Sequence, residues 1–439
     1  MDVRPRFALL NTKVIDGTGA PPQPQRAVIV EGSDIAAVVA MSDYRHTVDV
    51  QEIDCSDLHV LPGLIDAHVH LAGCRAGIED QELGALMEPP LARAVRSVSE
   101  AQALLKRGFT SVRDISWNGL YLKRIIREGS LAGPRIVACG PGLCRTGGHG
   151  DAYQFDEEFV RRNHFWAVLA DGPDEIRKAV RRLLREGADQ IKIWASGGGN
   201  WANDRNEDQH YSLDEIRTAV DEAHMQRGTL VLAHAENRDA IRDCLRAGVD
   251  TIEHGEDLDE ESCELMVARG VILVPTLYLL ARWFDDFMPT EAPTEHVRPE
   301  VFLQRDVDSL PDAEAGRRYA ERIRANFAMA RAKGVKIALG SDTVYSPLTP
   351  HGEYSARELL IMGEFGMTPL EAISAATKTA AEALGLSHRL GVVKAGMAAD
   401  LLVVEGDPSA SLKTLYDAGN IRWVFTNGRL AVEDGRLAF

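Results

Sequence analysis

A regular alternation of strands and helices, which starts near residue 61, most constrains the fold of this chain. Short apolar runs alternate with amphipathic helical patterns, and several helices end at a glycine just before the next strand, as at Gly187, Gly248 and Gly334. The eight expected strands cover residues 61–71, 110–114, 135–140, 190–195, 230–235, 251–254, 272–277 and 336–342. Eight such repeats favour an α/β fold of the (β/α)8 TIM-barrel type over an open sheet.

Both ends of the chain show a different pattern. Residues 1–60 and 386–439 contain short strands and turns without a helical period. We expect these two pieces to join into one small β-sandwich beside a barrel formed by residues 61–385. Within the barrel, residues 282–314 carry four prolines and interrupt the alternation. We interpret them as a lid over the mouth of the barrel, and the alternative is a surface excursion.

Composition limits the partners and the location of the protein. A net charge of −17 argues against nucleic acid and anionic membranes as partners, because both would be repelled. The six cysteines form no Cys-x-x-Cys pair, and we interpret them as mostly buried thiols in a reducing compartment. No signal-peptide core and no run of eighteen apolar residues is evident. We therefore expect a cytoplasmic protein with a small-molecule substrate, and homo-oligomers are common among large enzymes of this type.

Metal-ligating side chains recur at the ends of the expected strands. His68 and His70 alternate along the first strand, so both project from the same face. His234, His254 and Asp342 lie at or near the ends of the fifth, sixth and eighth strands, where barrel enzymes keep their chemistry. A single histidine in a core strand is usually structural, but five such residues on one rim are hard to explain as packing. Nitrogen and carboxylate ligands without a thiolate predict zinc or a similar divalent ion.

Lys192 is the unusual member of this set. It lies inside the fourth strand between two isoleucines, and a protonated ammonium group cannot bind a cation. A buried lysine can lose its proton, and the free amine can then take up carbon dioxide to form a carbamate. The two oxygens of this carbamate could bridge two metal ions. The alternative is a lysine in a structural ion pair.

These residues resemble the signature of the amidohydrolase superfamily in its binuclear form with a carboxylated lysine. Five further segments carry the same resemblance: 62–71, 146–151, 192–198, 252–255 and 391–401. They are most similar to the imidazolonepropionase-like branch. This branch includes Xaa-Pro dipeptidases, dipeptidases that release C-terminal Arg or Lys, and ochratoxin-type amide hydrolases.

The resemblance implies a centre of two divalent metal ions, expected to be zinc, with carbon dioxide bound to Lys192 as a bridging carbamate. The remaining ligands would be His68, His70 and Asp342 for the more buried ion, and His234 and His254 for the other. A hydroxide between the ions would attack the amide carbonyl, since metal binding brings the pKa of water near neutrality. Asp342 would take up the proton and pass it to the leaving amine.

Four residues are candidates for contacts with the substrate. His149 lies in a glycine-rich loop after the third strand, where it could polarise the carbonyl or bind a carboxylate, and Tyr278 directly follows the seventh strand. The alternatives are a histidine that stabilises its loop and a tyrosine that packs under the lid. Arg145 and His351 are weaker candidates.

One departure from the family pattern concerns the substrate. Relatives often read His-Ala-His after the fifth strand, whereas this chain reads His234-Ala235-Glu236. A carboxylate at Glu236 would repel an anionic group and favour a cationic or neutral one. The default substrate is a C-terminal dipeptide or an N-acyl amino acid. A xenobiotic or secondary-metabolite amide, carbamate or urea is the alternative, and a non-catalytic metal-binding protein is the remote one.

Overall fold

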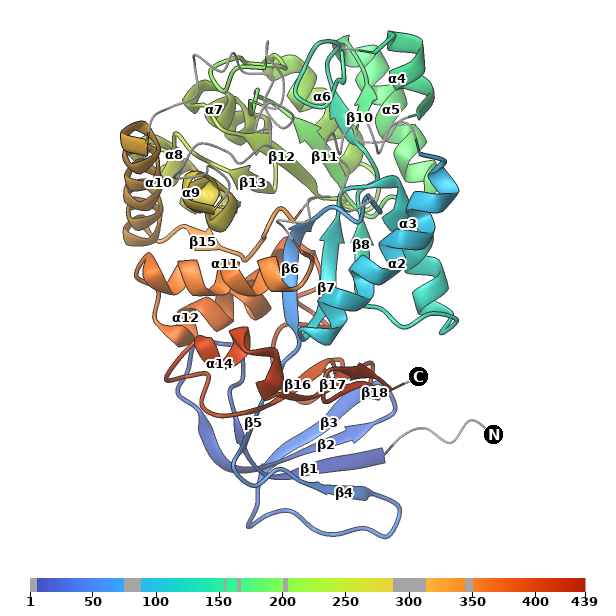
Figure 1. Ribbon diagram of the computed structural model, residues 1–439, viewed down its shortest axis with the longest axis vertical. Coiled ribbons are helices and arrows are strands. Elements are labelled where there is room, and N and C mark those ends of the chain that lie inside the picture. The colour runs from blue at the N-terminus through green and yellow to red at the C-terminus, as the bar shows by residue number, and fades with distance from the viewer. Residues whose placement is uncertain are drawn as a thin grey trace, which may run out of the picture.

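The computed structural model describes residues 6–74, 88–153, 155–163, 167–199, 204–286, 313–343 and 350–438, and Figure 1 shows their arrangement. Most of the predicted lid at 282–314 lies outside these residues, so the lid stays a prediction. All six cysteines are free, and five of them are buried, as expected. None of the helices in the described ranges is both long enough and apolar enough to cross a membrane.

Strands from both ends of the chain form a single sheet of nine strands, which lies at the bottom of Figure 1. Its N-terminal strands are β1 (Arg6–Val14), β2 (Gln23–Glu31), β3 (Asp34–Ala40), β4 (Gln51–Asp54) and β5 (Leu58–Pro62). Its C-terminal strands are β16 (Leu401–Glu405), β17 (Ile421–Thr426), β18 (Arg429–Glu433) and β19 (Arg436–Leu437). β16 pairs antiparallel with β5, with Val403 opposite Val60, and both valines belong to the buried cluster of this sheet. The two ends of the chain thus pair in one sheet, and the division into domains with a β-sandwich stays a prediction.

The middle of the chain forms two parallel sheets. One consists of β6 (Leu64–Val69), β7 (Phe109–Asp114) and β8 (Arg135–Ala138). The other has the order β10-β9-β11-β12-β13-β14-β15, in which the strands along the chain are β9 (Gly142–Cys144), β10 (Ala167–Leu169), β11 (Ile191–Trp194), β12 (Val231–Ala235), β13 (Thr251–His254), β14 (Ile272–Val274) and β15 (Lys336–Ile337). Their apolar side chains are buried, which matches the near-continuous hydrophobic runs of parallel strands.

Helices flank these strands in Figure 1. They are α2 (Pro90–Lys106), α3 (Trp117–Arg127), α4 (Glu157–Asn163), α5 (Gly172–Glu186), α6 (Leu213–His224), α7 (Arg238–Ala247), α8 (Glu260–Arg269), α9 (Leu277–Asp286), α10 (Ala313–Lys333), α11 (Glu353–Glu364), α12 (Pro369–Ser374), α13 (Ala380–Ala383) and α14 (Lys413–Tyr416). Gly187 and Gly248 end α5 and α7 in the left-handed conformation, as expected for helix-ending glycines. Ser212 and Glu215 form a capping box at the start of α6.

The strand boundaries differ from the prediction at several places. The first predicted strand, 61–71, divides into the end of β5 and β6, which ends at Val69. β14 ends at Val274 and not at residue 277, because Pro275 has no backbone N–H and α9 already begins at Leu277. The last predicted strand, 336–342, shortens to the two residues of β15. β9 and β10 were not predicted, since three-residue strands are too short to show a period.

The chain beyond β15 nevertheless runs beside β6. Ala67 N donates to the carbonyl of Leu339 at 2.9 Å, and Asp342 N donates to the carbonyl of His68 at 2.8 Å. A parallel bridge between Val69 and Thr343 continues this pairing. The α/β class with parallel strands is thus confirmed. Among the described residues the two parallel sheets do not form one continuous ladder, so the closed barrel stays a prediction.

Candidate metal centre

The first group of predicted ligands comes together at the end of β6. His68 and His70 are both buried, and their ring centroids lie 5.3 Å apart. Asp342 Oδ1 lies 2.9 Å from His70 Nε2 and 3.4 Å from His68 Nε2. Donor atoms around one zinc-like ion are about 3 to 4 Å apart, because each bond is about 2.0–2.2 Å long. The three residues therefore have the spacing of a metal site.

The second group lies at the ends of β12 and β13. The rings of His234 and His254 are 4.6 Å apart between centroids. The potential ligand atoms of His234, Glu236 and His254 all lie within 4.8 Å of one another, and the same holds for His68, His254 and Asp342. Because His254 belongs to both sets, the two groups are adjacent. The five predicted nitrogen and carboxylate ligands therefore lie close together, in two adjoining groups.

Protonation at the site suits metal binding. Burial lowers the pKa of His254 to about 4, and burial also holds the pKa of His68 and His234 well below the usual range. These imidazoles are therefore neutral near pH 7, which is the form that binds a metal. For Asp342, burial acts to raise the pKa, but the neighbouring His68 and His70 act in the opposite direction and keep the pKa well below its usual range.

Lys192 lies in β11 and is 1% exposed. Burial lowers the pKa of its ammonium to about 8, although the charges of Glu253 and Asp342 act in the opposite direction. A neutral amine is therefore accessible at mildly alkaline pH, which is what carboxylation requires.

Hydrogen bonds from outside the centre orient the ligands. His68 donates from Nδ1 to Glu253 Oε2 at 2.6 Å, and His70 donates from Nδ1 to the carbonyl of Ile115 at 3.0 Å. His254 Nδ1 is hydrogen-bonded to Thr276 Oγ1 at 2.8 Å. Metal-binding histidines usually have such a partner on the second ring nitrogen, which fixes the tautomer. The donor set and its supports therefore fit two divalent ions.

Glu253 was missed in the sequence, although its support of His68 is extensive. Its Oε1 accepts from Arg113 Nη2 at 2.7 Å and from Thr251 Oγ1 at 2.5 Å, and both charged side chains are fully buried. A buried ion pair offsets its desolvation only when such additional hydrogen bonds are present. The one signal in the sequence was a carboxylate directly before His254 in a predicted strand.

The backbone is strained where the ligands leave their strands. His254, Thr276 and Asp342 have φ values of 69°, 47° and 53°, in the left-handed region that non-glycine residues rarely adopt. Such strain persists only where the surrounding structure holds it, and it concentrates at functional sites. Two of the three residues are predicted ligands, and Thr276 is hydrogen-bonded to one of them, His254.

His149 lies next to the second group. Its ring stacks on that of His234 with 4.4 Å between centroids, and its Nδ1 donates to Asp204 Oδ2 at 2.7 Å. A Cβ at Gly198 would lie 2.4 Å from His149 Cε1 and 2.8 Å from His234 Cε1, so only glycine permits this stacking. His149 follows the unpredicted β9 and not directly the third predicted strand. Asp204 was missed, and no motif in the sequence marks it.

The other predicted contacts are placed less directly. Tyr278 lies in the first turn of α9, where its hydroxyl accepts from Arg357 Nη1 at 2.6 Å, and its backbone N–H donates to Glu358 at 2.7 Å. His351 is hydrogen-bonded through Nε2 to the carbonyl of His70 at 3.0 Å, so it supports the first group through the backbone. Arg145 donates to the carbonyl of Thr146 at 3.0 Å and is not in either metal-ligand group.

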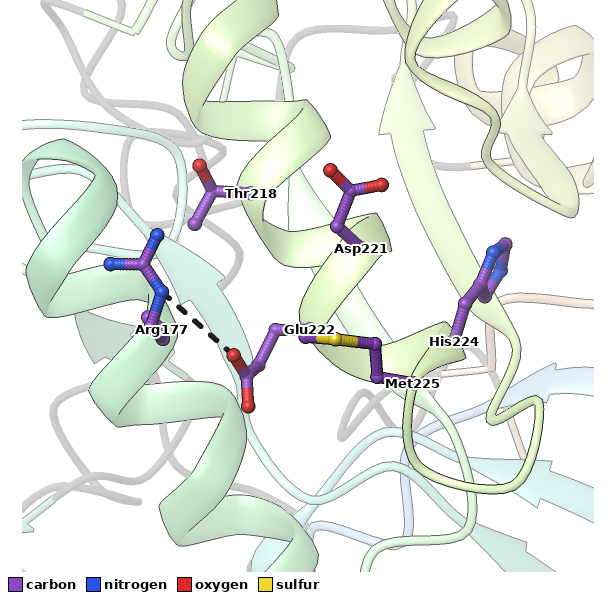
Figure 2. A pocket seen from close by; sticks show the side chains of 6 residues that line it. All are labelled: Arg177, Thr218, Asp221, Glu222, His224 and Met225. Carbon is purple, nitrogen blue, oxygen red and sulfur yellow. Dashed lines mark ion pairs between the residues drawn. The ribbon is translucent and has the colours of Figure 1, made fainter.

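A separate cavity of about 600 Å³ opens between α5 and α6. Figure 2 shows Arg177 of α5 paired with Glu222 of α6 at 3.8 Å across it. His224, at its other end, is hydrogen-bonded to Asp250, which directly precedes β13. The cavity therefore lies toward the ends where the strands begin, and the metal-ligand candidates lie where they end.

Comparison with known proteins agrees with the predicted family. The model of the amidohydrolase family matches residues 59–431. Ochratoxinase from Aspergillus niger is 30% identical over 389 residues, which cover 84% of this chain and 75% of that protein. Imidazolonepropionase from Erwinia tasmaniensis is 27% identical over 412 residues, which cover 86% of each chain. The crystal structure of a Xaa-Pro dipeptidase with methionine bound in its active site superimposes with a TM-score of 0.81 at 29% identity, and covers 98% of this chain and 100% of that one.

Proposed function

This chain belongs to the amidohydrolase family, and from that premise we propose that it hydrolyses the amide bond of a C-terminal dipeptide or an N-acyl amino acid. The observation that carries the proposal is the convergence of His68, His254 and Asp342 with His234 beside them and a buried Lys192. A protein that only stores metal would not need a buried lysine of lowered pKa within its ligand set.

We also propose the finer architecture. The two parallel sheets would be parts of one closed (β/α)8 barrel over residues 61–385, and the nine-stranded sheet would form a β-sandwich from residues 1–60 and 386–439. The pairing of β6 with residues 338–343 supports closure, because it joins the first parallel strand to the last. A cytoplasmic location, a homo-oligomeric state and a lid at 282–314 complete this proposal.

In the proposed reaction, His68, His70 and Asp342 would hold the more buried of two divalent ions, and His234 and His254 the other. Lys192, as its carbamate, would bridge them, and zinc is the expected metal. When bound, the ions would supply Lewis acidity and activate water near neutral pH. Asp342, which the structure keeps as a carboxylate, would accept a proton from the attacking water and return it to the leaving amine.

The substrate would be held by residues around the second group. We propose that His149, which stacks on His234, contacts the scissile carbonyl, and that Tyr278 contacts a substrate oxygen. Arg145 and His351 would act on the substrate from a greater distance. These assignments share one requirement, which is that the substrate enters from the side of β12 and β13.

A second candidate function rests on Glu236, which is only 5% exposed and lies 3.6 Å from His234 Nε2. If its carboxylate faces the substrate, it would disfavour the free carboxylate of a dipeptide. The substrate would then be a xenobiotic or secondary-metabolite amide, carbamate or urea. The likeness to ochratoxinase is compatible with both candidates.

A substrate panel tests the two candidates directly. Metal-loaded enzyme is assayed with C-terminal dipeptides, N-acyl amino acids, aryl amides, carbamates and ureas, with His254→Ala as the inactive control. Preference for dipeptides or N-acyl amino acids supports the first candidate, and preference for the neutral aryl compounds supports the second. Full metal loading without hydrolysis of any compound would instead support a metal-binding protein.

A further inference from the structure

We propose that Glu236 is an additional ligand of the second metal ion, beside His234 and His254. This inference rests on the proposed metal centre and changes the role of Glu236 from a residue that selects substrate charge to one that holds metal. Nothing in the family signature requires a carboxylate at this position, since relatives often have a histidine there.

The spacing of the side chains supports direct ligation. Glu236 Oε1 lies 3.6 Å from His234 Nε2, within the range of about 3 to 4 Å expected for two donors on one zinc-like ion. The ligand atoms of Glu236, His234 and His254 all lie within 4.8 Å of one another.

The local chain geometry explains how Glu236 reaches this place. β12 ends at Ala235, so His234 and Glu236 are separated by one residue at the end of a strand. Residues i and i+2 of a strand project from the same face, as His68 and His70 do at the end of β6. The His-x-Glu pair therefore repeats, on the second side of the centre, the arrangement of the His-x-His pair on the first.

The hydrogen bonds around Glu236 are those of an oriented ligand. Asn206 Nδ2 donates to Oε2 at 2.5 Å, and the backbone N–H of Glu236 donates to Ser196 Oγ at 3.0 Å. One carboxylate oxygen is thus held from outside, while the other faces His234. Carboxylates that bind metals are held in this way by their outer partners. A buried carboxylate also gains most from a nearby cation, because burial of an isolated charge is costly.

The test measures metal binding without substrate. Purified wild type, Glu236→Gln and Glu236→Asp are equilibrated with a series of buffered free zinc concentrations, and bound zinc per chain is determined by elemental analysis. Wild type is expected to bind two ions. Both variants are expected to keep the first ion and to bind the second about 10- to 100-fold more weakly. Gln removes the anionic ligand, and the shorter side chain of Asp holds the carboxylate farther from the ion.

Glu256→Gln is the matched control. Glu256 is a buried carboxylate just after β13, and it accepts a hydrogen bond from Tyr319 and pairs with Arg322 at 3.5 Å. The Glu256→Gln substitution removes one negative charge near the centre but no proposed ligand. The variant is therefore expected to bind two ions with wild-type affinity. Equal weakening by Glu256→Gln would overturn the inference, because general charge and not ligation would then explain the effect.

Glu236→Asp separates the two roles of Glu236 and also serves if Glu236→Gln fails to fold. It keeps the negative charge, so a charge-selecting residue would retain both metal affinity and substrate preference. Unchanged binding of the second ion by a folded Glu236→Asp or Glu236→Gln protein would overturn the inference. Wild-type protein with two ions and no hydrolysis of the substrate panel would refute the proposed function alone, since the metal measurement uses no substrate.

Discussion

The two sides of the centre are built differently. On the β6 side, strands and their buried partners hold the ligands: Glu253 accepts from His68 Nδ1, and Asp66 Oδ1 accepts from the backbone N–H groups of His68 and Ser341 at 3.0 Å each. On the β12–β13 side, the segment after β11 contributes. His234 Nε2 lies 3.1 Å from the carbonyl of Gly197, and Asn206 holds Glu236.

This difference suggests a division of labour. The β6 side has charged groups that are buried and fully paired, as in the ion pair of Glu253 with Arg113. Substitution of one of these buried, paired groups would lower the stability of the protein. Such groups therefore suit ligands that must stay in a fixed position. The β12–β13 side depends on Ser196, Gly197 and residues 204–210, which follow β11. We infer that the first side secures metal and the second adjusts it and positions the substrate.

The largest effect is expected on the β6 side, from Asp342→Asn. Asn removes both the anionic ligand and the proposed proton carrier, so kcat/KM should fall by about 10³-fold or more. Bound metal should decrease as well. Steady-state kinetics and elemental analysis measure both quantities. Asp174→Asn, at a carboxylate that is 99% exposed, is the control and should match wild type. An active Asp342→Asn enzyme would remove the basis for treating this side as essential.

Glu253→Gln tests the buried partners of the β6 side without substituting a proposed ligand. The change leaves Arg113 buried without its charged partner, which should cost about 3–5 kcal/mol of unfolding free energy. Metal affinity of the first site should fall by about 10- to 100-fold, because His68 loses the carboxylate on Nδ1. Denaturant unfolding and zinc titration give the two values.

Glu264→Gln is the control for this prediction, since Glu264 forms an exposed ion pair with Lys333 and should contribute less than about 1 kcal/mol. If Glu253→Gln leaves stability and metal affinity unchanged, buried ion pairs do not secure the ligands of the β6 side, and the proposed difference between the two sides is wrong.

The same contrast explains what the sequence could reveal. Ligands on strands were predictable, because a histidine at the end of an apolar run stands out, as at His254. Their supports were not, because the contacts join distant parts of the chain: Glu253 is 185 residues from His68, and Asp204 is 55 residues from His149. Likewise, longer strands such as β12 were predicted to within a residue, whereas β9 and β10 depend on pairing with neighbours and not on their own pattern.

The pH dependence of metal loading adds a test at Lys192. Burial lowers the pKa of Lys192 to about 8, so the reactive neutral amine is a minor species at pH 6 and becomes dominant above pH 8. Reactivation of metal-free enzyme by bicarbonate and zinc should therefore accelerate with pH, by about tenfold per unit below pH 8, and level off above it. Reactivation rates at fixed dissolved carbon dioxide test this. A rate independent of pH between 6 and 8 would argue against carboxylation of Lys192.

The smallest effect, and the sharpest test of the second side, is expected from Asp204→Asn. Asp204 accepts from His149 Nδ1 at 2.7 Å and lies 3.3 Å from the backbone N–H of Gly198. An asparagine oxygen can still accept one of these bonds, but it does not hold the proton on Nδ1 as a carboxylate does. We expect kcat to fall by about tenfold, since proton-transfer and orienting partners contribute effects of this order or larger, while both metal ions remain bound.

The matched control for Asp204→Asn is Asp208→Asn, in the same segment and without a predicted role, which should keep wild-type kcat. Kinetics and metal content are measured together, because only their combination separates the two sides. If Asp204→Asn loses metal as Glu253→Gln does, the second side is also part of the metal frame. If it lowers kcat with full metal content, His149 depends on Asp204 for its orientation toward the substrate, and Asp204 acts on catalysis and not on metal retention.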